Sequence, residues 1–103
     1  MYAVFEVKRA DAAKIDATLQ DHANPKVDLV SRQSIAIRDA GSLGLPGEGR
    51  LVLIEGTDAA LAAAGELFQG FASRLQGAAA EAAYRAFKSQ DEDVASGIGL
   101  IFG

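Results

Sequence analysis

Apolar and polar residues alternate at the start of the chain, and this alternation predicts a strand over residues 2–7. Phe5 and Val7 share one face of that strand, while Tyr2 and Val4 share the other. Because both faces carry apolar side chains, the strand is expected to lie inside a sheet rather than at its edge.

Three further segments have the pattern of extended chain. Residues 27–38 alternate at both ends around a polar centre, which predicts either one bulged strand or two short strands. Residues 51–55 are apolar up to Glu55, as in a strand that is covered on both faces. Residues 98–102, interrupted by Gly99, are predicted to form the last strand.

Apolar residues recur at helical spacing in the segments between these strands. The first predicted helix covers residues 12–23, with Asp11 as its N-cap, and ends at Asn24 because the residue before Pro25 avoids helical angles.

A second helix is predicted to begin at a cap formed by Thr57 or Asp58 and to extend to residue 75. A third follows Gly77, and the sequence leaves open whether it is collinear with the second helix through a kink or a separate helix.

The predicted order of elements is therefore β-α-β-β-α-α-β, which places the chain in the α+β class. This order corresponds to a two-layer sandwich of the ferredoxin-like β-α-β-β-α-β type, with an additional helix before the last strand. The chain has 103 residues with no repeat or linker, so residues 1–103 are expected to form a single domain.

The apolar character of both sheet faces has a structural consequence. Helices of a ferredoxin-like fold cover one face, so the other face needs cover as well. Either the third helix packs on the open face or a second subunit does. We favour self-association through this sheet face, which predicts a homodimer or a larger oligomer.

Composition and charge narrow the range of partners. The formal net charge of −4 disfavours nucleic acid and anionic membrane surfaces as partners. The chain contains no cysteine and a single histidine, and its acidic run at residues 91–93 lacks an EF-hand pattern, so we expect no metal and no cofactor. The first residues lack a basic segment ahead of the apolar ones, so no signal peptide is expected, and the absence of cysteine fits a cytoplasmic location.

Residues 41–50 read GSLGLPGEGR and invite comparison with phosphate-binding loops. Those loops lead from a strand into a helix, whereas this segment leads into the apolar strand, and it lacks the G-K-[ST] ending of a P-loop. We therefore predict a flexible hairpin loop with fast amide exchange across residues 42–48. Its glycines are Gly41, Gly44, Gly47 and Gly49.

Four residues are candidates for ligand binding. His22 is predicted to lie in the last turn of the first helix, where the helix dipole favours imidazolium and a capping role. Arg32 and Arg38 flank the predicted bulge, and Tyr84 lies one turn before Phe87 on the third helix.

These features favour a function without catalysis. We expect a small cytoplasmic oligomeric domain that binds a protein or a small molecule, with a regulatory or protein-interaction role. The alternative is a small-molecule enzyme of the dimeric α+β barrel type, which would need polar groups converging in a pocket between sheet and helices.

Overall fold

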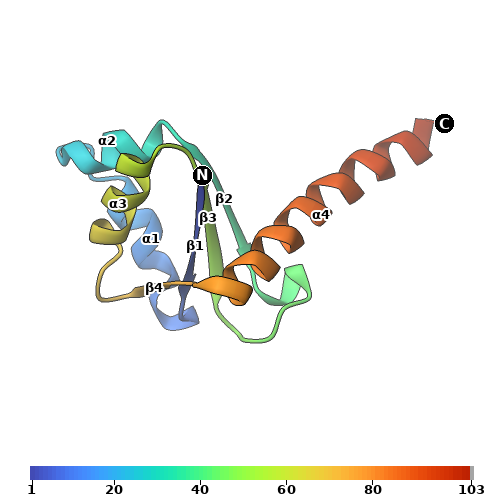
Figure 1. The fold of residues 1–103 in the computed structure, drawn as a ribbon, viewed down its shortest axis with the longest axis horizontal. Helices are drawn as coiled ribbons and strands as arrows, with labels where there is room; N and C mark the ends of the chain where they lie inside the picture. Colours follow the sequence, from blue (N-terminus) through green and yellow to red (C-terminus); the bar gives the residue numbers. More distant parts are fainter. Residues whose placement is uncertain (103) are drawn as a thin grey trace.

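A four-stranded antiparallel sheet lies at the centre of the computed structural model, which describes the backbone of residues 1–102 and the side chains of residues 1–90 (Figure 1). The strand order is β2-β3-β1-β4, and every neighbouring pair is antiparallel. The strands are β1 (Tyr2–Val7), β2 (Ser34–Asp39), β3 (Arg50–Glu55) and β4 (Ala72–Arg74). The α+β class predicted from the sequence is thus confirmed.

Helices lie on both sides of this sheet (Figure 1). Helices α1, α2 and α3 cover one face, and α4 lies against the other face before it leads away from them. The helical elements are η1 (Arg9–Asp11), α1 (Ala12–Leu19), α2 (Pro25–Ser31), η2 (Gly41–Leu43), α3 (Asp58–Leu67) and α4 (Gly77–Phe102). Among the described residues, none of these helices has both the length and the apolar character that a bilayer crossing requires.

The predicted strand over residues 27–38 is wrong in its first half, because Pro25–Ser31 form helix α2. Asn24 does not end a helix but caps this one, since its Oδ1 accepts a hydrogen bond from the Lys26 amide at 3.0 Å. Pro25 is suited to the first helical position, where no N–H partner is needed. Val27 and Val30 lie three residues apart on the buried side of the helix, so their spacing is helical even though valine favours strands.

The first helix is shorter than predicted, since α1 ends at Leu19. The second is also shorter, because α3 ends at Leu67 and Gly70 then adopts a φ of +95°, which a helix does not permit. The predicted cap of that helix is confirmed at Thr57, whose hydroxyl accepts a hydrogen bond from the Ala60 amide at 3.2 Å.

The last strand was predicted in the wrong place. Residues 98–102 belong to helix α4, and the fourth strand is Ala72–Arg74, which pairs with β1. The additional helix therefore follows the last strand instead of preceding it. The strand begins after the turn at Gly70, and α4 begins at Gly77, which has a φ of +55°.

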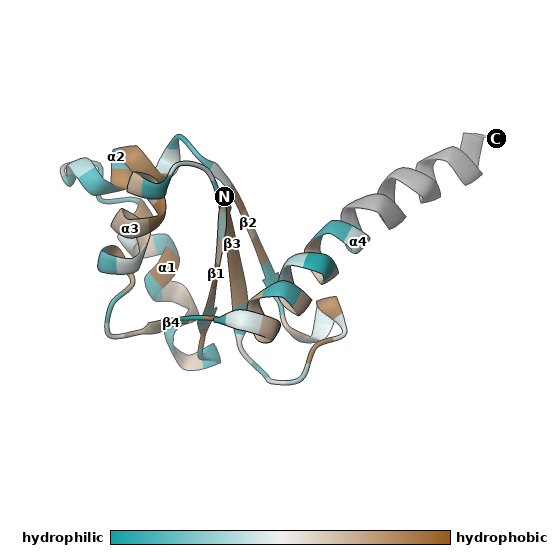
Figure 2. Ribbon diagram, viewed as in Figure 1, coloured by the Kyte–Doolittle hydropathy of each residue, from teal (hydrophilic) through white to brown (hydrophobic). Residues whose placement is uncertain are grey.

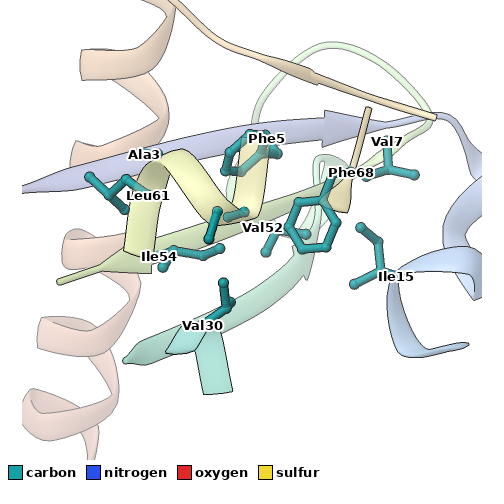
Figure 3. Packing of buried hydrophobic residues seen from close by; sticks show 11 residues of the cluster. Ala3, Phe5, Val7, Ile15, Val30, Val52, Ile54, Leu61 and Phe68 are labelled. Atoms are coloured by element: carbon teal, nitrogen blue, oxygen red, sulfur yellow. The ribbon is translucent and has the colours of Figure 1, made fainter. Parts of the chain in front are cut away.

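The larger core fills the space between the sheet and helices α1–α3 (Figure 3). Phe68 lies at its centre, with its ring 5.3 Å from that of Phe5 in an edge-to-face arrangement. Its buried members are all apolar, and they are Ala3, Phe5, Val7, Ile15, Val30, Val52, Ile54, Leu61, Ala63, Ala64 and Phe68.

The second core lies on the opposite face of the sheet. Val4 and Leu53 of the central strands are buried there beneath Ala83 and Phe87 of α4. Figure 2 shows why both sides need cover, because the central strands are coloured as apolar along most of their length. Of the two solutions that the sequence left open, the structure thus contains the packing of the C-terminal helix on this face.

Candidate functional site

A cluster of four side chains joins α4 to the end of the sheet. Glu55 is the last residue of β3 and lies beside Tyr2 of β1 in the strand register. Tyr84 and Lys88 lie one turn apart on α4, so both project from the same side of that helix. We call Tyr2, Glu55, Tyr84 and Lys88 the Tyr–Glu–Lys cluster.

Lys88 and Glu55 make the ion pair of this cluster, and the two tyrosines make its aromatic contact. Lys88 Nζ lies 2.9 Å from Glu55 Oε1 and 3.1 Å from Oε2, so both carboxylate oxygens are engaged. The rings of Tyr2 and Tyr84 stack with their centroids 4.1 Å apart and an interplanar angle of 23°. The Lys88 ammonium also lies 5.3 Å from the centroid of the Tyr84 ring, within the range of a cation–π interaction.

These contacts shift two pKa values away from the neutral range in which a general base or acid works best. The hydrogen bond from Lys88, followed by that from Tyr84, lowers the pKa of Glu55 below its ordinary value of 4.5. The hydrogen bond to Glu55 raises the pKa of Tyr84 above 10.0. A general base is most effective when its pKa lies near the working pH, so this carboxylate is a weak base and the tyrosine stays protonated. The cluster is therefore suited to holding α4 on the sheet.

The lowered pKa of Glu55 leads to a pH prediction. Its carboxylate contributes stability above pH 4.5, and this contribution is lost as the pH falls through the lower pKa of the folded state. Because both partners are partly exposed, we expect the loss to be about 0.5 kcal/mol. The chain has two tyrosines and no tryptophan, and both tyrosines belong to the cluster, so near-ultraviolet circular dichroism reports on it directly.

Glu55→Gln is the matched control for this titration. The variant keeps the shape of the side chain and an oxygen that accepts hydrogen bonds, but it cannot titrate. We expect its tyrosine signal to lose the acid transition of the native protein. An unchanged acid transition in the variant would assign the pH dependence to other carboxyl groups.

The four residues singled out in the sequence lie on separate elements. Tyr84 belongs to the Tyr–Glu–Lys cluster, whereas His22 lies in the turn between α1 and α2 and not in a helix, because α1 ends at Leu19. The imidazole Nδ1 of His22 lies 3.9 Å from Asp28 Oδ1, and the side chain is 70% exposed. A group so open to solvent provides no pocket for acid–base chemistry.

The two candidate arginines lie on different elements and make different contacts. Arg32 is the exposed C-cap residue of α2. Arg38 lies on β2, where its Nη1 donates a hydrogen bond to the carbonyl of Ile37 at 2.8 Å and its Nε donates one to Gln90 Oε1 at 3.2 Å. Arg38 thus helps to attach α4, whereas Arg32 contributes no such contact among the described side chains.

The first half of the glycine-rich loop is packed against α4. Leu43 and Leu45 join the core on that face of the sheet, and the amides of both donate to the carbonyl of Ala40, at 3.1 and 3.0 Å. The side chain of Gln90 donates a hydrogen bond to the carbonyl of Ser42 at 2.9 Å.

This packing refines the expected amide exchange of the loop. We predict slower exchange at Leu43 and Leu45, whose amides are bonded, than at Gly47 and Glu48 in the second half. Native-state hydrogen exchange followed by nuclear magnetic resonance measures each position. Equal, fast exchange at all four amides would show that the loop leaves α4 readily.

Gly49 closes the loop at a point where there is no room for a side chain. A Cβ atom on this residue would lie 2.4 Å from the carbonyl oxygen of Val7, whereas one on Gly41 would meet nothing within 4 Å. We therefore predict that Gly49→Ala lowers the free energy of unfolding by about 1–3 kcal/mol, since backbone must move to accept the methyl group. Urea denaturation measures the change, and Gly41→Ala, expected to stay within about 0.5 kcal/mol, is the control.

Several open grooves lie on the described surface, and two of them adjoin the Tyr–Glu–Lys cluster and the glycine-rich loop respectively. One, of about 820 Å³, runs beside Tyr2 and Tyr84 between the sheet and the first turns of α4. The other, of about 700 Å³, lies between the loop and α1, and it mixes Arg9 and Arg50 with carboxylates such as Asp39, whose Oδ1 lies 3.1 Å from Arg50 Nε. Opposite charges neutralise each other there, so this groove has no strong preference for an anion.

Sequence reasoning missed Tyr2, Glu55 and Lys88 as members of a common cluster. The helical spacing of Tyr84 and Lys88 is visible in the sequence, but nothing in it shows that α4 turns back onto the end of β3. Within the described part of the chain, no group of three or more His, Cys, Asp or Glu side chains is arranged to hold a metal ion.

Comparisons with known proteins found no relative of this chain: no family model matches it, and neither a curated protein nor a solved structure does.

Proposed function

We propose that this protein is a non-catalytic interaction domain of the ferredoxin-like kind, which works in the cytoplasm as an oligomer. The strand order supports the ferredoxin-like assignment, since β1 and β3 are central and antiparallel to their neighbours. Helices α1 and α2 connect β1 to β2, and α3 connects β3 to β4, which fits the two crossovers of a split βαβ unit.

The observation that carries the proposal is the apolar filling between the layers. A barrel-type enzyme would bind its substrate between sheet and helices, with polar groups converging in that space. Here the space holds the larger core around Phe68, and no polar or charged residue is buried among the described side chains. An enclosed reaction centre of that type therefore has no room, and recognition is left to the outer surface.

The charges of the surface favour a protein as the partner. The net charge of −4 opposes the phosphate backbone of nucleic acids and the headgroups of anionic lipids. The grooves are open and of mixed charge, whereas sites for small molecules usually enclose most of the ligand.

A ligand screen followed by thermal unfolding tests this proposal. A small molecule present at 100 times its dissociation constant would stabilise the fold by about 2.7 kcal/mol, which raises the melting temperature of a domain this size by roughly 10–20 °C. We expect no metabolite in the screen to produce such a rise. A saturable rise with one class of metabolite, abolished by a substitution in its groove, would favour the enzyme or a small-molecule receptor instead.

A further inference from the structure

Strand β2 is an edge strand, and no further strand of the described chain pairs with its outer side. It is six residues long and pairs with β3, whereas β4 at the other edge has three residues. The amide of Ala40 donates to the carbonyl of Gly49 at 3.0 Å and so continues the ladder between β2 and β3. Because antiparallel ladders alternate, the even-numbered residues of β2 bond to β3, and the backbone groups of Ile35 and Ile37 point outward.

This edge carries little protection against pairing. Natural edge strands are usually blunted by lysine, proline, bulges or a covering element. Residues 34–39 contain no lysine, proline or glycine, and their register with β3 is regular. Among the described side chains, only that of Arg38 bonds to an outward-pointing backbone group of β2, through its hydrogen bond to the Ile37 carbonyl.

We propose that a second copy of this chain pairs with the β2 edge, forming a continuous eight-stranded sheet about a twofold axis through Ala36. This inference rests on the proposed function and names the partner and the surface for it. It moves the expected self-association from the face of the sheet, which α4 covers with Ala83 and Phe87, to the edge. Backbone pairing of this kind is a recurrent mode of protein recognition, and a twofold axis makes it self-complementary.

The side chains of β2 favour the pairing register with Ala36 on the axis over the adjacent registers. With Ala36 on the axis, Ile35 lies opposite Ile37 of the second copy, and both isoleucines are only half-buried in the isolated chain. Their outward amides and carbonyls then form two hydrogen-bonded residue pairs across the axis. An axis through Ile37 would instead place Ile35 opposite Asp39, an apolar side chain against a carboxylate.

Pairing requires the Arg38 guanidinium to leave the Ile37 carbonyl. The side chain then lies opposite Ser34 of the second copy in the same register. The Arg38 hydrogen bond that each chain gives up is offset by the backbone hydrogen bonds formed between chains, and we expect a reversible association.

Disulfide trapping tests the register, because the natural chain contains no cysteine. In Ala36→Cys the two introduced residues would face each other as a non-hydrogen-bonded pair with Cα atoms about 4.5 Å apart, close enough for a disulfide. We expect mild oxidation to convert most of this variant to a covalent dimer.

Ser34→Cys is the matched control on the same strand face. Its two copies would be separated by four residues along the strand, roughly 14 Å, so it should not cross-link with itself. Mixed with Arg38→Cys, however, it should form a heterodimer, because residues 34 and 38 lie opposite each other in the proposed register.

Sedimentation of the unmodified chain over 1–200 µM, as a concentration series, completes the test, with dimer expected at the upper end. A monomer throughout would overturn both this inference and the oligomer of the proposed function. A dimer in which Ala36→Cys fails to cross-link would overturn this inference alone, whatever Ser34→Cys does. A dimer through another surface would leave the proposed function standing. A saturable rise in melting temperature in the ligand screen would contradict that function, whether or not β2 pairs with a second copy.

Discussion

Phe68→Ala is expected to lower the free energy of unfolding by about 3–5 kcal/mol, the largest effect of any substitution proposed for this protein. Phe68 is fully buried at the centre of the larger core, and its ring packs edge-to-face against both Phe5 and Phe71. Removal of the ring leaves a cavity that the rigid sheet on one side cannot fill. Because small domains have a total stability of about 5–15 kcal/mol, this loss is a large part of it.

Urea denaturation followed by far-ultraviolet circular dichroism measures this loss. Phe71→Ala is the matched control, since that ring belongs to the same aromatic group but is only half-buried. We expect it to reduce stability by about 1–2 kcal/mol. Equal effects of the two substitutions would mean that the burial of Phe68 is not what stabilises the helices on the sheet.

Phe87→Ala is expected to release α4 from the sheet, with a loss of about 3 kcal/mol in stability. Phe87 is 4% exposed, and with Ala83 it covers the apolar residues Val4 and Leu53 of the central strands. Without the ring that face becomes accessible, so the variant should bind an apolar dye such as ANS. The near-ultraviolet signal of the tyrosines should fall as well, because Tyr84 lies one turn away and stacks on Tyr2.

Arg85→Ala is the matched control on the same helix. The Arg85 side chain is 76% exposed and pairs with Glu81 of α4 itself, so its removal should change stability by less than about 0.5 kcal/mol. Dye binding should remain at the level of the unmodified chain. If Phe87→Ala were equally silent in both measurements, α4 would not be the cover of this face in solution.

Strand β4 illustrates how pairing can override a sequence pattern. Residues 72–74 were predicted to continue the helix that begins after Thr57, because Phe68 and Phe71 follow its apolar stripe. A three-residue strand is too short to show a period of its own, and it exists because β1 offers hydrogen bonds to it. The positive φ of Gly70 makes the turn that brings it there.

Less of the candidate site than of the fold could be predicted from the sequence. Tyr84 was singled out by its helical spacing to Phe87, but its partners Tyr2 and Glu55 lie on strands more than 25 residues earlier in the chain. Contacts of that kind depend on where α4 meets the sheet. A single sequence carries no signal for such a meeting point.

The sequence by itself determined the two central strands and the need to cover both of their faces. Residues 2–7 and 51–55 are apolar on both faces, and a strand of that kind is stable only when both faces are covered, so its place inside a sheet follows from local pattern. The tertiary structure decided how the second face is covered and which polar groups meet there. Cover could come from α4 or from another subunit at a similar gain in buried apolar area, and the choice of α4 depends on the turn at Gly77 and on the contacts of Phe87, Lys88 and Gln90.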